Sequence, residues 1–210
     1  GCLESASWFA DHFKLTDSVY DNLIAVFIEK CGDGQLELAQ WMMERFKLQP
    51  ADRQVHRALH YSCHNGHLRV ASWLADSFDL SVRDRSDTDR YNELLILSCK
   101  TGHLAVAQWL VDRFRLRPND ERVDRAFSYS CRHGHFPVAK WLSERFDLVA
   151  DDRYRRQRNI DFFQISCRFG YLELAQWLAD RFKLIVNADD ALRISCENGH
   201  LKIAIWLTEQ

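Results

Sequence analysis

The chain has 210 residues, of which 47% are hydrophobic and 12% aromatic, so it carries enough apolar surface for a folded core and is not a disordered chain. Its 28 basic and 30 acidic residues nearly cancel, so no overall charge directs it to nucleic acid or to a membrane surface. Apolar runs are short, as in LLIL at 94–97, whereas a bilayer-spanning helix needs about 20 apolar residues. We find no secretory segment at the start, and because Met is not the first residue we expect a fragment or a processed chain.

Seven tryptophans divide the chain into repeats. They stand at positions 8, 41, 73, 109, 141, 177 and 206, with a Gly seven residues before each and a Cys ten residues before the last six. The same phrase surrounds each Trp, as in LELAQWLADRFKL at 172–184. The pattern predicts one tandem array over residues 1–210 with seven units, the first and last partial: 1–20, 21–52, 53–84, 85–120, 121–152, 153–186 and 187–210.

Each unit has the apolar spacing of two helices. In the third unit, residues 57–63 predict a shorter first helix, on which Leu59 and Cys63 share a face. Gly66 then ends that helix, because Gly tolerates the left-handed backbone that reverses the chain. The second helix carries one buried stripe (Val70, Ala71, Leu74, Phe78), and we expect Trp73 to fill the seam with a neighbouring helix. Two units have a 36-residue period, which predicts long connections at 81–93 and 149–161.

Residues 57–70, RALHYSCHNGHLRV, resemble the ankyrin repeat, whose core reads Thr-Pro-Leu-His-x-Ala-Ala-x-x-Gly-His. Leu59, His60, Gly66 and His67 match that core, while Ser and Cys replace the two Ala. The resemblance covers nearly the whole chain and implies an all-α, ankyrin-like solenoid of stacked helix-turn-helix repeats. Thr-Pro is absent and Trp-Leu with a later Phe-x-Leu is present, which favours a longer second helix over β-hairpin fingers. These variants are similar to arrays of protists and large DNA viruses.

The cysteines could form disulfides, bind zinc, act as nucleophiles or fill space. Equivalent positions on stacked helices lie about 8–10 Å apart, beyond the roughly 7 Å Cα separation that a disulfide spans. We therefore expect a thiol in a small buried slot, as ankyrin-like repeats give to Ala. Unpaired thiols predict a reducing compartment, which we take as the cytoplasm with the nucleus left open.

The histidines offer a weak metal hypothesis. His60 and His64 are four apart on one helix and could hold one metal ion, but only one unit has that pair. The resemblance implies a structural role for the His after each Gly, which opens the second helix and bonds the adjacent loop. Gln35 and Tyr171 occupy the same position in other units, which argues against a metal or catalytic role.

An acidic residue follows each Trp by three positions, and Arg follows it at 45, 113, 145 and 181. We expect solvent-side ion pairs between repeats, worth about 0.2–1 kcal/mol each. A catalytic carboxylate pair needs a pocket that raises one pKa, and a ladder on an outer helix has none. No Gly-rich phosphate loop is present, so we predict no catalytic residue, no metal, no cofactor and no enzyme.

The two residues after each Cys differ from unit to unit, and the resemblance implies that they border the concave, partner-binding groove. In successive units they include His64, Lys100, Arg132 and Arg168, a row that suits an acidic or phosphorylated peptide. Adding Phe169 and two residues of the second long connection gives the predicted partner-binding set: His64, Lys100, Arg132, Arg168, Phe169, Tyr154 and Arg155.

These observations predict a non-catalytic interaction module or scaffold whose partner is another protein, with no small-molecule substrate and no membrane. One alternative is end-to-end self-association. Terminal units of an isolated solenoid normally have polar outer faces, whereas the first and last units here keep apolar residues as though another unit followed (Trp8, Phe9, Ile203, Ile205, Trp206). A less favoured alternative is single-stranded nucleic acid bound by the Arg-rich stretch 153–158. Gly1-Cys2 would fit a lipidation signal after loss of Met, but Gly1 also fits the repeat register.

Overall fold

The computed structural model describes the backbone of residues 17–148, 153–184 and 188–209, and the side chains of these ranges except 17–19, 120, 153–155 and 188. Within these ranges the regular structure is entirely α-helical, which confirms the predicted all-α class. The first helices of the repeats are α2 (Asp17–Gly32), α4 (Asp52–His64), α6 (Arg85–Lys100), α8 (Asp120–Arg132), α10 (Arg153–Phe169) and α12 (Ala188–Glu197). The second helices are α3 (Leu36–Phe46), α5 (Leu68–Ser77), α7 (Leu104–Arg113), α9 (Phe136–Arg145), α11 (Leu172–Arg181) and α13 (Leu201–Thr208).

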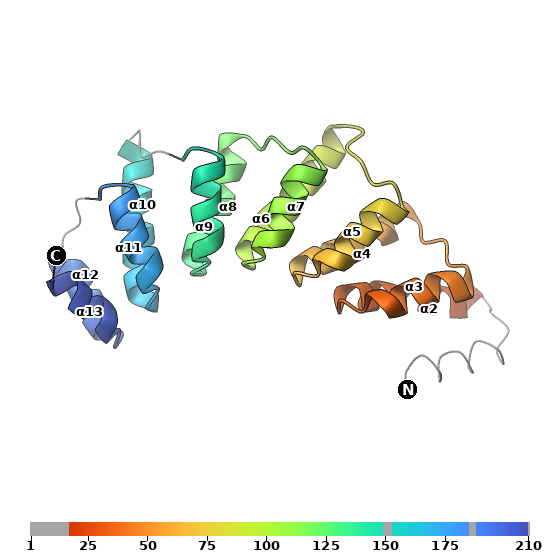
Figure 1. Cartoon of the computed structure of the whole chain (residues 1–210), viewed down its shortest axis with the longest axis horizontal. Helices are drawn as coiled ribbons and strands as arrows, with labels where there is room; N and C mark the ends of the chain where they lie inside the picture. The colour runs from red at the N-terminus through yellow and green to blue at the C-terminus, as the bar shows by residue number, and fades with distance from the viewer. Residues whose placement is uncertain (1–16, 149–152, 185–187, 210) are drawn as a thin grey trace. The chain divides into compact units, whose positions relative to one another are not determined.

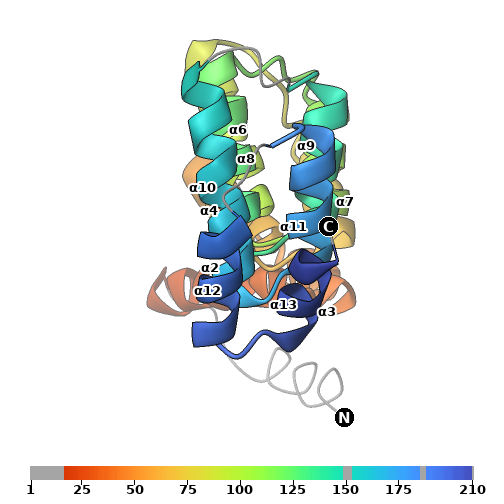
Figure 2. The same ribbon diagram turned by 90° about the vertical axis from the view of Figure 1, so that its left-hand side faces the viewer.

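The helices belong to two compact units, in each of which helix pairs follow one another in chain order (Figure 1). The first unit contains α2 to α5, α7, and α6 through Ser98. The second unit contains residues 99–104 and α8 to α13. Within each unit the first helices form one layer and the second helices form the other (Figure 2). Gly1-Cys2, Trp8 and Phe9 lie outside the described residues.

The lengths of the helices differ from the prediction. The first helices are the longer ones, with 13 residues in α4 against 10 in α5, so the expected short first helix and long second helix are wrong. The added residues of the 36-residue repeats extend α6 and α10 to 16 and 17 residues. The stretches from 85 to 93 and from 153 to 161 are therefore helical and not connections.

The start of α6 explains why its charged sequence is helical. The Asp84 carboxylate accepts a hydrogen bond from the Asp87 backbone N–H at 2.9 Å. The Asp87 carboxylate in turn accepts one from the Arg83 backbone N–H at 3.1 Å. These two reciprocal bonds satisfy backbone N–H groups that have no partner within the first turn of a helix. A polar stretch whose composition is typical of a loop can therefore start a helix.

The core of each repeat follows the predicted stripe. Val70, Ala71 and Leu74 are buried, whereas Phe78 at the end of the stripe is only half-buried. Trp73 contacts the first helix of the preceding repeat, with its ring 6.2 Å from that of Phe27. The same contact recurs in the second unit between Trp177 and Phe127, at 6.4 Å. The predicted seam position of the Trp is confirmed at these repeats.

Each second helix except α13 ends on a non-glycine residue in the left-handed region, at Lys47, Asp79, Arg115, Asp147 and Lys183. The following Leu donates its N–H to a carbonyl five residues back, as Leu80 does to Ala75 at 2.9 Å. Leu80 is also buried, so the turn is stabilised by an apolar contact as well as by a backbone hydrogen bond. The Phe-x-Leu phrase therefore specifies a Schellman-type helix end in which the middle residue adopts the strained conformation.

Candidate functional site

Five of the predicted binding residues stand at the ends of the first helices, just before tight turns: His64, Lys100, Arg132, Arg168 and Phe169. In the third repeat, Gly66 has a φ of 81°, and His67 donates its N–H to the Ser62 carbonyl at 2.8 Å. His135 makes the same bond to Ser130 at 2.8 Å. Because a left-handed Gly reverses the chain in each case, the two residues before it are held at the tip of the turn. The variable residues therefore sit on a fixed backbone.

A ring from the following repeat covers each of four turn glycines. His67 lies over Gly34, His135 over Gly102, Tyr171 over Gly134 and His200 over Gly170. His135 Nε2 lies 3.0 Å from the Lys100 carbonyl, and His200 Nε2 lies 2.8 Å from that of Arg168. A carbonyl only accepts, so Nε2 is the donor in both bonds. The expected structural His is confirmed at these two positions: it opens the second helix and bonds the adjacent loop.

Buried serines make a second link that sequence reasoning missed. Ser62 Oγ lies 3.0 Å from the Cys31 carbonyl and 2.8 Å from the Ala58 carbonyl of its own helix, so its single proton is shared between the two. Ser130 Oγ likewise lies 3.3 Å from the Cys99 carbonyl and 2.8 Å from that of Ala126. The recurrence of Ser in the sequence could have indicated this link, because Ser directly precedes five of the six repeat cysteines (Cys63, Cys99, Cys131, Cys167, Cys196). The backbone carbonyl of one first helix is thus bonded by the next repeat.

The cysteines fill the predicted slot in five of six described repeats. Cys31, Cys63, Cys99, Cys131 and Cys167 are buried, and the described cysteines form no disulfide. Burial raises the pKa of the Cys63 thiol to about 12, so it stays protonated and a poor nucleophile. Cys196 is exposed, so the packing prediction is wrong for the last repeat. Burial of this thiol depends on packing against helices of other repeats, and the local sequence around Cys196 does not determine that packing.

The turns of the second unit carry exposed cations and an exposed aromatic ring. Lys100, Arg132 and Arg168 are exposed, and Phe169 is 56% exposed. The Phe169 ring stacks on Tyr171 with 6.0 Å between centroids. We call these four residues, Lys100, Arg132, Arg168 and Phe169, the turn-tip surface. Part of this cationic character serves the helix itself, because a basic residue stabilises the negative end of a helix dipole.

The remaining predicted residues are described apart from that surface because they lie in the first unit or at the other end of α10. His64 belongs to the first unit, where its ring stacks with His60 at 6.5 Å. Among the described residues no group of three potential metal ligands occurs around this pair or elsewhere. Tyr154 and Arg155 lie in the first turn of α10, roughly 20 Å along the helix from Arg168. Their side chains lie outside the described residues, and the structure does not bring their backbone to the turn tips.

The rest of the Arg-rich stretch is partly structural. Arg158 forms a two-pronged ion pair with Asp124 of α8, with N–O distances of 2.9 and 3.0 Å. It also lies 5.9 Å from the Phe162 ring centre. Arg158 therefore links α10 to α8, and this residue contributes to packing as well as to surface charge.

The ladder of charges after each Trp is confirmed at one described pair. Arg113 of α7 lies 3.4 Å from Asp76 of α5, which joins two successive repeats. Arg113 also lies over the Phe114 ring, as Arg145 does over Phe146 and Arg181 over Phe182. These arginines lie over the phenylalanine ring at the end of their own helix. The ladder therefore contributes to the framework.

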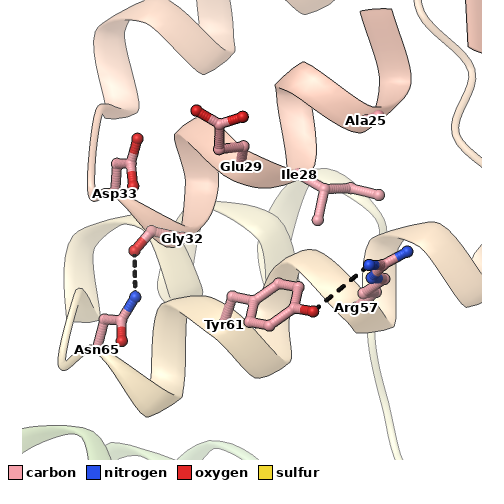
Figure 3. Close-up of a pocket in the computed structure, with 8 residues that line it drawn as sticks. All are labelled: Ala25, Ile28, Glu29, Gly32, Asp33, Arg57, Tyr61 and Asn65. Atoms are coloured by element: carbon pink, nitrogen blue, oxygen red, sulfur yellow. Dashed lines mark hydrogen bonds between the residues drawn. The ribbon is translucent and has the colours of Figure 1, made fainter. Parts of the chain in front are cut away.

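Both units have hollows between successive first helices. In the first unit a hollow of about 380 Å³ lies between α2 and α4 (Figure 3). Its lining includes Glu29 and Asp33 from α2 and its continuation, and Arg57 and Tyr61 from α4. Arg57 bonds the Tyr61 hydroxyl at 3.5 Å and also lies over its ring.

The hollow of the second unit measures about 610 Å³ and lies between α8 and α10. Its lining from α8 includes Arg125, Tyr129 and Arg132, and α10 contributes Arg158. Arg132 thus belongs both to this hollow and to the turn-tip surface. The hollow was not predictable from local sequence, because Arg158 comes beside Arg125 and Arg132 only where α10 packs against α8.

Comparison with protein-family models and with curated proteins finds no match for this chain. In the part of the chain that the structure describes, no helix combines the length and apolar character that crossing a bilayer requires.

Proposed function

We propose that the chain is an ankyrin-like solenoid that acts as a non-catalytic interaction module and binds an acidic segment of another protein. The observation that carries the proposal is the turn-tip surface, in which three exposed cations flank an exposed Phe169. Cations attract carboxylates or phosphates, and an exposed aromatic ring is a typical anchor at protein interfaces. A cytoplasmic location is part of the proposal, because buried thiols persist in reducing compartments.

The clamped turns support this function energetically. Each tip is bounded by a left-handed Gly and by a ring or bond from the next repeat, as at Gly102 and His135. A surface that is ordered before its partner arrives loses less conformational entropy on binding. The repeat framework therefore supplies rigidity, and the variable tip residues supply selectivity.

Immobilised poly-L-glutamate is a suitable probe, with poly-L-lysine as the opposite-charge reference. We expect the variant Arg132→Glu/Arg168→Glu to bind polyglutamate about tenfold or more weakly than the wild type. The matched control is Arg69→Glu/Lys183→Glu, which makes the same charge change at exposed sites outside the turn tips. Equal losses in both variants would show that only overall charge matters and would overturn the proposal. Tighter binding of oligo(dT) than of polyglutamate would favour a nucleic-acid surface instead.

Self-association remains a second candidate because α13 exposes apolar side chains. Leu201 is 69% exposed and Ile205 is 47% exposed, although their neighbour Ile203 is buried. Sedimentation velocity across a range of concentrations tests it. A concentration-dependent dimer that disappears in Leu201→Glu would support self-association, and a monomer at every concentration would exclude it.

A further inference from the structure

The hollow between α8 and α10 gathers basic side chains around one tyrosine. Arg125, Ser128, Tyr129 and Arg132 line it from α8. They are spaced at i, i+3, i+4 and i+7, so they share one face of the helix. Lys100, at the end of the preceding first helix, lies 5.5 Å from the centre of the Tyr129 ring. Arg132 and Lys100 are exposed, so their charged groups are accessible to a ligand.

The acidic residues of the hollow leave a positive excess at one end. Asp124 is held by both guanidinium nitrogens of Arg158, so its charge is compensated within the protein. The other carboxylate, Glu121, precedes Arg132 by eleven positions, or roughly 16 Å of helix. Counting Lys100 beside the Tyr129 ring, four basic groups surround two acidic ones. The end formed by Lys100, Tyr129 and Arg132 is therefore cationic.

The first unit provides the same framework with the opposite charges. Arg57 and Tyr61 of α4 correspond in repeat position to Arg125 and Tyr129 of α8. Where the second unit has Lys100, the first has Gly32, and a Cβ there would lie only 3.0 Å from the Tyr61 Cβ. That hollow is lined by Glu29 and Asp33, whose carboxylates both bond Lys30. The Arg–Tyr pair is thus shared by these two hollows, and the charges around it differ.

We propose that the hollow of the second unit binds a phosphorylated side chain of the partner protein, which rests on the proposed function above. A phosphomonoester carries close to two negative charges and three strong acceptor oxygens near neutral pH. Arg132 can present a planar fork of donors to those oxygens, with the Lys100 ammonium beside it. A carboxylate offers one charge and two oxygens and leaves part of this cluster uncompensated.

The test uses a short acidic peptide labelled with fluorescein and made in three forms, with phosphoserine, Ser or Glu at its centre. Fluorescence anisotropy measures binding to the full chain. We expect the phosphoserine form to bind about tenfold or more tightly than the Glu form. Arg132→Ala should remove most of that preference, and Arg132→Lys should restore part of it, because Lys keeps the charge without the fork.

Arg57→Ala is the matched control, since it removes the equivalent of Arg125 from the hollow of the first unit, and it should leave the preference unchanged. Equal affinity for the phosphoserine and Glu forms would overturn the phosphate site. An equal loss in Arg57→Ala would overturn it as well. Displacement of the peptide by an equal concentration of inorganic phosphate would show a simple anion site and would also overturn it. If the wild type binds polyglutamate although the phosphate site is overturned, the proposed function stands. If the wild type does not bind polyglutamate, the proposed function is refuted independently of the phosphate site.

Discussion

Replacing Gly102 by Ala tests the clamp between repeats directly. Gly102 has a φ of 83°, a region that costs an L-residue about 1–2 kcal/mol. The new Cβ would also lie 2.5 Å from His135 Nδ1, so the imidazole would have to move. Moving it breaks the bond of Nε2 to the Lys100 carbonyl, which contributes about 0.5–1.5 kcal/mol. We expect Gly102→Ala to lower the free energy of unfolding by about 2–3 kcal/mol.

Urea unfolding followed by far-UV circular dichroism measures this cost, and two comparisons isolate the clamp. In a His135→Ala background the ring is already absent, so Gly102→Ala should cost only the backbone strain of about 1–2 kcal/mol. Gly199 has a φ of 76° with no heavy atom within 4 Å of the added Cβ, so Gly199→Ala should also cost strain alone. If Gly102→Ala costs the same with and without the His135 ring, the ring does not clamp the turn.

Three further predictions concern the thiol slot, the helix ends and the serine links. Because burial raises the pKa of Cys63 to about 12, the unfolded state loses that proton near pH 9 while the folded state keeps it. Stability therefore falls above pH 9, and the advantage of wild type over Cys63→Ala should shrink by about 1 kcal/mol between about pH 9 and 10 in urea titrations. Asp79→Gly should raise the free energy of unfolding by about 0.5–1 kcal/mol, since φ is 45° there, whereas Asp79→Ala should give no gain. Ser62→Ala should cost about 1–2 kcal/mol by removing a buried hydroxyl that bonds the Cys31 and Ala58 carbonyls, against a near-zero effect for the exposed Ser77→Ala.

Each of these three has an outcome that contradicts it. A pH-independent difference between wild type and Cys63→Ala would mean that the thiol is not buried. Destabilisation by Asp79→Gly would mean that the aspartate makes a favourable contact that outweighs its backbone strain. Equal effects of Ser62→Ala and Ser77→Ala would remove the serine bond from the links between repeats.

The repeat period, the turns and the helix pairs were predictable because they depend on residues close together in sequence. Gly66 ends a helix wherever it occurs in this phrase, and the stripe through Val70 and Leu74 follows from helical spacing. The extension of α6 was missed because residues 85–93 are charged, and their helical state depends on the reciprocal bonds of Asp84 and Asp87.

The hollow and the exposed thiol were not predictable for a different reason. Arg125 shares a helix face with the variable tip residue Arg132 through its i, i+7 spacing, but Arg158 joins them only through the packing of α8 against α10. Cys196 has the same local phrase as its buried counterparts, yet it is exposed. Both features depend on which helices of other repeats lie alongside, and a local pattern carries no such information.

Three recurrent links between repeats, made by the Ser, His and Trp side chains, run in one direction. Within each unit the later repeat supplies the side chain, as with Ser62, His200 and Trp73, and the earlier repeat supplies a backbone carbonyl, a Gly or a ring. A ribosome releases the earlier repeat first, so each new helix pair meets a docking surface that already exists. The nascent chain can therefore assemble one repeat at a time, and no repeat has to wait for a side chain that is still to be synthesised before it docks on its predecessor.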